Sequence, residues 1–198
     1  FALGNGIDIK SDTSQMVVNI GGDTTNIATM ANYSIISGYN FSIGGSIISI
    51  AIAKYIDETY NIHISVEQAE RLKVEICSLF ENYSASLEIT GINKQTQVKE
   101  SLTINASELF PIIKHYYSKI AEAINTVIQN SDPEVISDKA KNGIYFYGGA
   151  TAIVGFEKFM YEQTKFKVIL SDNSRSNMLG TAELIKYPQL LKRILKNN

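Results

Sequence analysis

The segment from Met16 to Ala28, with the sequence MVVNIGGDTTNIA, constrains the fold of this chain more than any other part. Strand-forming residues run into a Gly-Gly turn and continue after two threonines as a second β-rich run, which predicts a β-hairpin. A glycine turn has no side chains in its way, so its backbone N–H groups can approach a phosphate closely. Asn19 stands before the turn, where a phosphate-binding hairpin would place an acid to hold a metal. The segment therefore suggests a nucleotide site with altered metal chemistry, and a plain hairpin with glycines at positive φ is the alternative.

Composition excludes several classes of protein. The 198 residues can bury a core as one domain, or as one domain with an insertion. No apolar run reaches the ~20 residues of a membrane span, and the net charge of −2 gives no reason to expect nucleic acid or an anionic membrane as a partner. One cysteine, Cys77, and two histidines, His63 and His115, argue against a zinc site and fit a reducing compartment. The chain starts at Phe1 without Met or a signal-type segment, so we expect a piece of a longer protein.

The pattern of apolar residues predicts an α/β fold with a mixed sheet and flanking helices. Three strands are expected to form an antiparallel meander, and later strands should join through βα crossovers. The predicted strands cover residues 15–20, 24–31, 33–42, 143–147 and 166–170. The predicted helices of this part cover residues 46–60, about 106–130, a short segment from 133, the segment around 156–160, 174–186 and 188–196.

A capped helix and a hairpin interrupt this α/β order between residues 64 and 104. Ser65 and Gln68 have the spacing of a capping box, with Ser65 as N-cap. The expected elements are a helix from 65 to about 82, with Leu79 and Phe80 on its packed side, and strands 84–90 and 96–104 around a turn at 91–94. We therefore divide the chain into a core, residues 1–63 and 105–198, and an inserted subdomain, residues 64–104.

Two further motifs could carry chemistry. Gly148, Gly149 and Ala150 follow a buried strand and precede a helix, where a nucleotide can pack against backbone; a tight structural turn is the alternative. Glu70 and Lys73 lie one helical turn apart. This spacing has two interpretations: an exposed ion pair, or a pair of polar side chains placed over a ribose or base. A Walker-type phosphate loop is missing from the sequence. Tyr116 and Tyr117 fit the apolar stripe of the helix over 106–130 and need no ligand.

Together and in this order, the motifs resemble those of the MreB family of bacterial actin-like proteins, within the actin and heat-shock-chaperone ATPase superfamily. The family's second phosphate loop, V-V-D-I-G-G-G-T-T-E, is similar to residues 17–26, and its I-G-G-D-x-F-D element to residues 43–49. Its adenosine helix, A-E-R-I-K-x-E-I-G-S, is similar to residues 69–78, and its adenosine loop, T-G-G-G-A-L-L, to residues 147–153. The resemblance covers essentially the whole chain, as the second half of the family fold. Another branch, such as a cell-division or plasmid-segregation ATPase, is an alternative that residues 69–78 disfavour.

This resemblance implies an RNase-H-like, actin-like ATPase domain: subdomain IIA as the core and subdomain IIB as the α+β insertion. It implies an ATP or ADP site whose residues come from three places. The phosphate end would comprise Asn19, Gly21, Gly22, Asp23 and Thr24. Glu70 and Lys73 would address the ribose and adenine, and Gly148, Gly149, Ala150, Thr151 and Ala152 would lie along the adenosine.

Departures from the family pattern concentrate at the phosphate and metal end. Asn19 stands where the family has the aspartate that holds magnesium through water, and a neutral amide favours a divalent cation less. Asp23 replaces a glycine and puts a negative charge beside the phosphates, while Ser46 and Ser49 replace two acids. Ala150 in place of a glycine is a mild change. We therefore expect weakened magnesium binding and assign no catalytic residue and no metal ligand.

The predicted function is half of an MreB-like bacterial filament subunit, which supplies one wall of an ATP cleft and polymer contacts involved in cell shape. The expected partners are further copies of itself and the first half of the same fold, in the cytoplasm. That first half would supply the other phosphate loop, the residue that positions the hydrolytic water, and any membrane contact, so whether ATP is hydrolysed stays open. The alternative function is a scaffold or interaction module with a degenerate nucleotide site.

Overall fold

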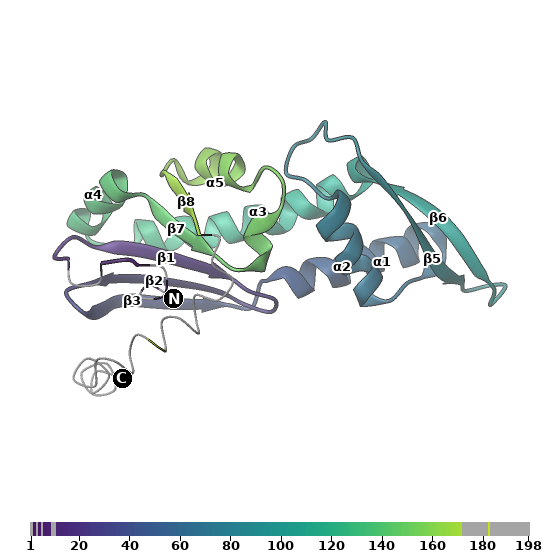
Figure 1. The fold of residues 1–198 in the computed structure, drawn as a ribbon, viewed down its shortest axis with the longest axis horizontal. Helices are drawn as coiled ribbons and strands as arrows, with labels where there is room; N and C mark the ends of the chain where they lie inside the picture. The colour runs from purple at the N-terminus through teal and green to yellow at the C-terminus, as the bar shows by residue number, and fades with distance from the viewer. Residues whose placement is uncertain (1, 3, 5, 9–10, 172–181, 183–198) are drawn as a thin grey trace.

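The structure is a computed structural model that describes residues 2, 4, 6–8, 11–171 and 182. Two parts lie one after the other along the long axis of the molecule: a larger sheet with helices, and a smaller sheet with helices (Figure 1). The predicted helices at 174–186 and 188–196 lie outside the described residues. None of the described helices is long and apolar enough to span a membrane.

The larger sheet is mixed, as predicted, with the strand order β3-β2-β1-β7-β8. Strands β1 (Gln15–Ile20), β2 (Thr25–Ala31) and β3 (Ser34–Phe41) form the antiparallel meander. Strands β7 (Ile144–Tyr147) and β8 (Val168–Leu170) join it in parallel. Because parallel strands need crossover connections, the chain places helices between them, and these cover one face of the sheet.

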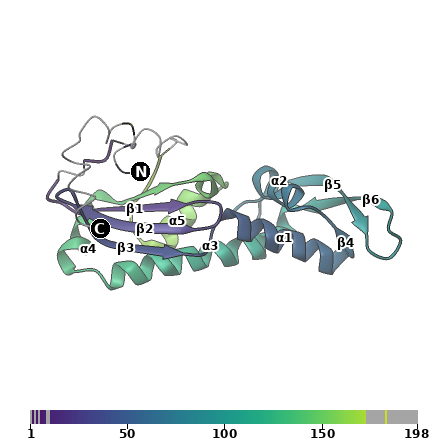
Figure 2. The ribbon, with the colours of Figure 1, turned by 90° about the horizontal axis from the view of Figure 1, so that it is seen from below.

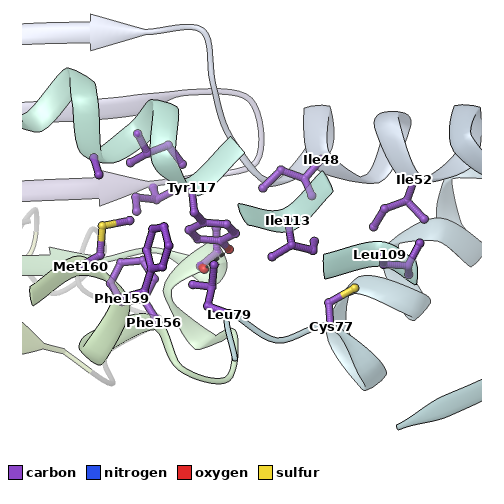
Figure 3. Packing of buried hydrophobic residues seen from close by; sticks show 14 of the residues in the cluster. Ile48, Ile52, Cys77, Leu79, Leu109, Ile113, Tyr117, Phe156, Phe159 and Met160 are labelled. Atoms are coloured by element: carbon purple, nitrogen blue, oxygen red, sulfur yellow. Dashed lines mark hydrogen bonds between the residues drawn. The ribbon is translucent and has the colours of Figure 1, made fainter. Parts of the chain in front are cut away.

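Helix α3 (Ala106–Gln129) runs along the underside of the larger sheet and continues to the smaller part (Figure 2). Helix α4 (Pro133–Asn142) follows α3 in the chain, and α5 (Phe156–Thr164) packs against α3. The buried stripe of α3 includes Ile113 and Tyr117, which meet Phe156 and Met160 of α5 in one core (Figure 3). This core is continuous through both parts, so the two parts share one packed hydrophobic interior.

The smaller part is an antiparallel sheet of order β4-β5-β6, from β4 (Ile62–His63), β5 (Ser86–Asn93) and β6 (Lys99–Asn105). Helix α1 (Gly45–Tyr60) leads to it from the larger sheet, and α2 (Val66–Ile76) packs against α1. The predicted hairpin is confirmed. The division into a core and an inserted subdomain remains a prediction, and β4 begins two residues before its proposed boundary.

The turn predicted at residues 91–94 is wrong. Gly91 lies inside β5 opposite Glu100, and the chain reverses after Asn93, whose side chain accepts hydrogen bonds from the N–H groups of Gln95 and Thr96. A Cβ at Gly91 would stand 2.3 Å from Cγ2 of Ile62. This glycine therefore serves the close approach of β4 to β5, and not a turn.

Helix α2 begins as predicted, because the Ser65 hydroxyl accepts a hydrogen bond from the Gln68 N–H at 3.3 Å. It ends at Ile76, however, and not near residue 82. The next residues leave the helix because the Leu79 N–H donates to the Val154 carbonyl at 2.8 Å. Leu79 is buried as expected, but Phe80, which we expected on the packed side of a longer helix, is 41% exposed.

The Cys77 thiol should be unreactive in the folded chain. Burial raises the pKa of Cys77 to about 12, and only the thiolate is an effective nucleophile. We expect a disulfide-type thiol reagent at neutral pH to leave the native chain unlabelled and to label it fully in urea. Because the sequence holds one cysteine, the absorbance change reports this side chain alone. Fast stoichiometric labelling of the native chain would contradict the packing described here.

Candidate nucleotide-binding cleft

The three motifs singled out in the sequence meet at one cleft of about 380 Å³. Its walls are the turn between β1 and β2, the start of α1, one side of α2, and the 3-10 helix η2 (Gly149–Ala152) that follows β7. The lining residues are Gly21, Gly22, Gly45, Ser46, Glu70, Lys73, Val74, Tyr117, Gly149, Ala150, Ala152 and Ile153.

Most of the predicted site residues, but not all, line this cleft. The cleft includes Gly21, Gly22, Glu70, Lys73, Gly149, Ala150 and Ala152. The lining does not include the predicted residues Asn19, Asp23, Thr24, Gly148 and Thr151. Asn19 is paired within the sheet, Asp23 is exposed at the turn, and the hydroxyl of the buried Thr151 donates to the Gly148 carbonyl at 2.8 Å. That these residues contact a nucleotide remains a prediction.

Residues 21–24 form a tight turn, which we call the phosphate loop. The Gly21 N–H closes it by donating to the Thr24 carbonyl at 2.9 Å. Within the described part of the chain, the N–H groups of Gly22, Asp23 and Thr24 make no hydrogen bond. Three successive backbone donors of this kind are suited to an anion. The alternative of glycines at positive φ is wrong, because Gly21 and Gly22 both have ordinary φ values.

The phosphate loop also caps helix α1. The Gly45 N–H donates to the Gly21 carbonyl at 2.9 Å, and the Ser46 N–H donates to the Gly22 carbonyl at 2.7 Å. These are donors that the first turn of a helix cannot satisfy itself. A Cβ at Gly44 would stand 2.3 Å from the Gly22 oxygen, so the absence of a side chain there permits the contact.

Lys73 and Glu70 are not the exposed ion pair of the simpler interpretation. The Lys73 side chain is 9% exposed, and its Nζ donates to Oε2 of Glu70 at 2.6 Å, to the Gly45 carbonyl at 2.8 Å and to Oγ of Ser49 at 3.1 Å. Burial raises the pKa of Glu70, but hydrogen bonds from Lys73 and Ser49 and the charge of Lys73 outweigh it, so this pKa lies below its usual value. Glu70 is therefore a carboxylate at neutral pH, half-exposed at the cleft wall.

The turn after β7 has a conformation that only glycine adopts readily. Gly148 has φ 99°, and a Cβ there would stand 2.1 Å from the Ile20 carbonyl oxygen at the end of β1. This close approach places η2 next to the phosphate loop. Tyr117 also holds η2, because its hydroxyl donates to the Ala150 carbonyl at 2.6 Å.

Tyr117 is the residue of this cleft that sequence reasoning interpreted too simply. Its ring packs in the apolar stripe as expected, edge-on to Phe156, but its hydroxyl holds η2 and the residue lines the cleft. The available signal was a tyrosine where the stripe is otherwise mainly aliphatic, since a buried hydroxyl needs a partner. Ser46, which the sequence comparison marks only as the replacement of a family acid, also lines the cleft.

The residues at this cleft fit a nucleotide better than they fit a metal ion. Backbone donors of the phosphate loop, the Glu70 carboxylate and the small residues of η2 suit phosphates, hydroxyls and a flat base, respectively. Among the described residues, no group of three or more His, Cys, Asp and Glu side chains could hold a metal. Among the lining residues that the structure describes, Glu70 is the one carboxylate, and it is engaged by Lys73 and Ser49.

Comparison with known proteins gives a consistent family. The family model described as MreB/Mbl protein matches residues 1–193. The cell shape-determining protein Mbl of Bacillus cereus is 27% identical over 198 residues, which cover 98% of this chain and 60% of that relative. The cell shape-determining protein MreB of Escherichia coli is 27% identical over 173 residues, which cover 87% of this chain and 50% of that protein. The chain thus spans between half and three fifths of the length of these relatives.

Solved structures show the same fold. The structure of MreB 5 of Spiroplasma citri bound to AMPPNP matches with a TM-score of 0.88 and 27% identity, over 100% of this chain and 59% of that chain. A structure of the MamK double helical filament matches with a TM-score of 0.76 and 20% identity, over 94% of this chain and 57% of that chain. The chain therefore has the actin-like α/β fold that the sequence predicted.

Proposed function

This chain belongs to the MreB/Mbl protein family, and we propose that it supplies one wall of a nucleotide cleft in a filament-forming subunit that contributes to cell shape. The convergence of the phosphate loop, Glu70 and η2 on one cleft carries this proposal. The related structures of MreB 5 bound to AMPPNP and to ADP support an adenine nucleotide as the ligand. We place the protein in the cytoplasm, with residues 1–63 and 105–198 as subdomain IIA and residues 64–104 as subdomain IIB.

In this proposal, different parts of the cleft bind different parts of the nucleotide. The N–H groups of the phosphate loop bind the β- and γ-phosphates, and the Glu70 carboxylate accepts hydrogen bonds from ribose hydroxyls. The residues from Gly148 to Ala152 form the surface along the adenosine, since small side chains let a base lie close to the backbone. The other wall belongs to the first half of the fold, so the chain by itself should bind nucleotide weakly and should not hydrolyse it at the rate of a complete subunit.

Magnesium should contribute little to nucleotide binding, because the position that the family uses for its magnesium-holding carboxylate is Asn19. Its Oδ1 lies against the turn after β7, 2.9 Å from where a Cβ of Gly148 would stand. A magnesium ion bound with the nucleotide would be held mainly by the phosphates and water. Asp23, exposed at the tip of the phosphate loop, would repel the phosphates unless its side chain stays in solvent.

Calorimetric titration with ATP, in magnesium and in a chelator, tests the proposal. We expect the chain to bind with nearly the same affinity in both buffers. In Asn19→Asp, we expect magnesium to tighten binding by about tenfold, because a carboxylate at this position attracts the cation. Asn82→Asp adds the same charge at an exposed position away from the cleft and should behave like the unchanged chain. Strong magnesium dependence without substitution, together with no effect of Asn19→Asp, would contradict the proposal.

A scaffold without nucleotide is the second candidate function, favoured by the neutral Asn19 at the position of the family's magnesium-holding acid and by the negative charge of Asp23 beside the phosphates. It predicts no ATP binding in either buffer, even when the chain is joined to the first half of its fold. Self-association is proposed from the relatives, since a solved structure shows MamK as a double helical filament. Sedimentation of the intact protein with and without ATP separates the two functions: a nucleotide-dependent polymer supports the first, and nucleotide-independent behaviour supports the second.

A further inference from the structure

Lys73 has no hydrogen-bond donor left for a nucleotide. An ammonium group carries three N–H donors. In the structure, Nζ has three protein acceptors, at 2.6 Å from Glu70, 2.8 Å from the Gly45 carbonyl and 3.1 Å from Ser49. The side chain is only 9% exposed, although the residue borders the cleft. Direct binding of a phosphate or base by Nζ would require breaking one of these bonds.

The three acceptors belong to two different elements. Gly45 and Ser49 come from the first turns of α1, and Glu70 comes from α2. Gly45 is itself bonded to the phosphate loop, because its N–H donates to the Gly21 carbonyl at 2.9 Å. Direct contacts therefore run from Glu70 through Lys73 and Gly45 to the phosphate loop. A Cβ at Gly45 would stand 3.0 Å from Nζ of Lys73, so a side chain here would crowd the link.

We propose that Lys73 is a positioning residue that holds the phosphate loop and Glu70 in fixed relative placement, and that it does not bind the nucleotide itself. This inference rests on the proposed nucleotide site and changes the role of Lys73 within it. With this link in place, the adenosine side and the phosphate side of the cleft are aligned before the nucleotide binds. Less free energy is then lost in ordering the cleft residues when the nucleotide binds. Loss of the link should therefore disturb both sides at once.

Hydrogen exchange of the nucleotide-free chain tests the link directly. In Lys73→Met, we expect hydrogen exchange at the bonded Gly21, Gly45 and Ser46 amides to rise by about tenfold or more, because the start of α1 loses a charged partner. Arg71→Met is the matched control: it removes the same charge from the same helix, but its partner Glu75, at 2.7 Å, belongs to an exposed pair. This control should leave those amides unchanged. If Lys73→Met does not fold, Ser49→Ala removes one acceptor and should raise the same exchange rates by a smaller factor.

Binding of two partial ligands gives an independent readout. Tripolyphosphate probes the phosphate loop, and adenosine probes the Glu70 and η2 side. A positioning role predicts that Lys73→Met weakens both, whereas a direct ligand predicts weaker binding of one probe with amide exchange unchanged. Unchanged exchange in both Lys73→Met and Ser49→Ala would overturn the inference. Since exchange is measured without nucleotide, failure of the chain to bind ATP when it is joined to the first half of its fold would refute the proposed function and leave the test of Lys73 valid.

Discussion

Gly148→Ala should destabilise the chain by about 3 kcal/mol or more, one of the two largest effects that we expect of a single substitution. Two costs add at this position. Alanine at φ 99° is strained, and its Cβ would stand 2.1 Å from the Ile20 oxygen and 2.6 Å from the Ile20 carbonyl carbon. Both of the overlapping atoms are backbone at the end of a central strand, so they cannot rotate away. Relief requires β7 to separate from β1, and these two strands pair in parallel through the middle of the larger sheet.

The adjacent glycine is the control. Gly149 has an ordinary φ, and a Cβ there meets no atom within 4 Å. Gly149→Ala should therefore change the free energy of unfolding by less than about 0.5 kcal/mol. Urea unfolding of the two variants without nucleotide, followed by circular dichroism, measures the difference. Equal midpoints would mean that the turn after β7 does not have the conformation described here.

Lys139→Met should stabilise the chain at neutral pH. The Lys139 side chain is fully buried in α4, and its Nζ donates to the Ser131 hydroxyl at 3.0 Å. Burial lowers the pKa of Lys139 from 10.5 to about 8. At pH 7 the folded chain therefore carries a buried charge that the unfolded chain keeps in water. The shift corresponds to a cost of up to about 3 kcal/mol, from which the lost hydrogen bond to Ser131 must be subtracted.

The same shift determines how stability changes with pH. Below about pH 8 the lysine is charged in both states, and the folded chain bears the full cost. Between pH 8 and 10.5 the folded state releases its proton first, so the unfolded state binds more protons and stability rises with pH. Urea midpoints of the unchanged chain and Lys139→Met should therefore differ most near pH 7 and converge as pH approaches 10. A difference in urea midpoint that widens with pH would contradict the lowered pKa of Lys139. Because the two chains share all other groups that titrate in this range, the effects of those groups cancel in the comparison.

Local sequence determined much of the fold. The strand at residues 15–20, the Ser65 cap and the start of a helix at residue 133 depend on neighbours within a few residues, and each prediction is confirmed. Errors arose where a distant segment decided the outcome. Helix α2 ends at Ile76 because Leu79 bonds to Val154, and Gly91 serves the packing of β4, not a turn. Neither partner is visible in the local pattern.

By itself, the sequence determined that a glycine hairpin, a helix with Glu70 and Lys73, and a glycine turn after a buried strand occur in this order, and it predicted that they form one site. Only the tertiary structure decided how they meet, because long-range contacts set the distances between them. Parallel pairing of β1 with β7 brings Gly148 against Ile20, and the start of α1 binds the phosphate loop. The tertiary structure also decided that Lys73 is buried, with all three of its donors engaged. An exposed ion pair and a buried link have the same spacing along a helix, and only packing distinguishes them.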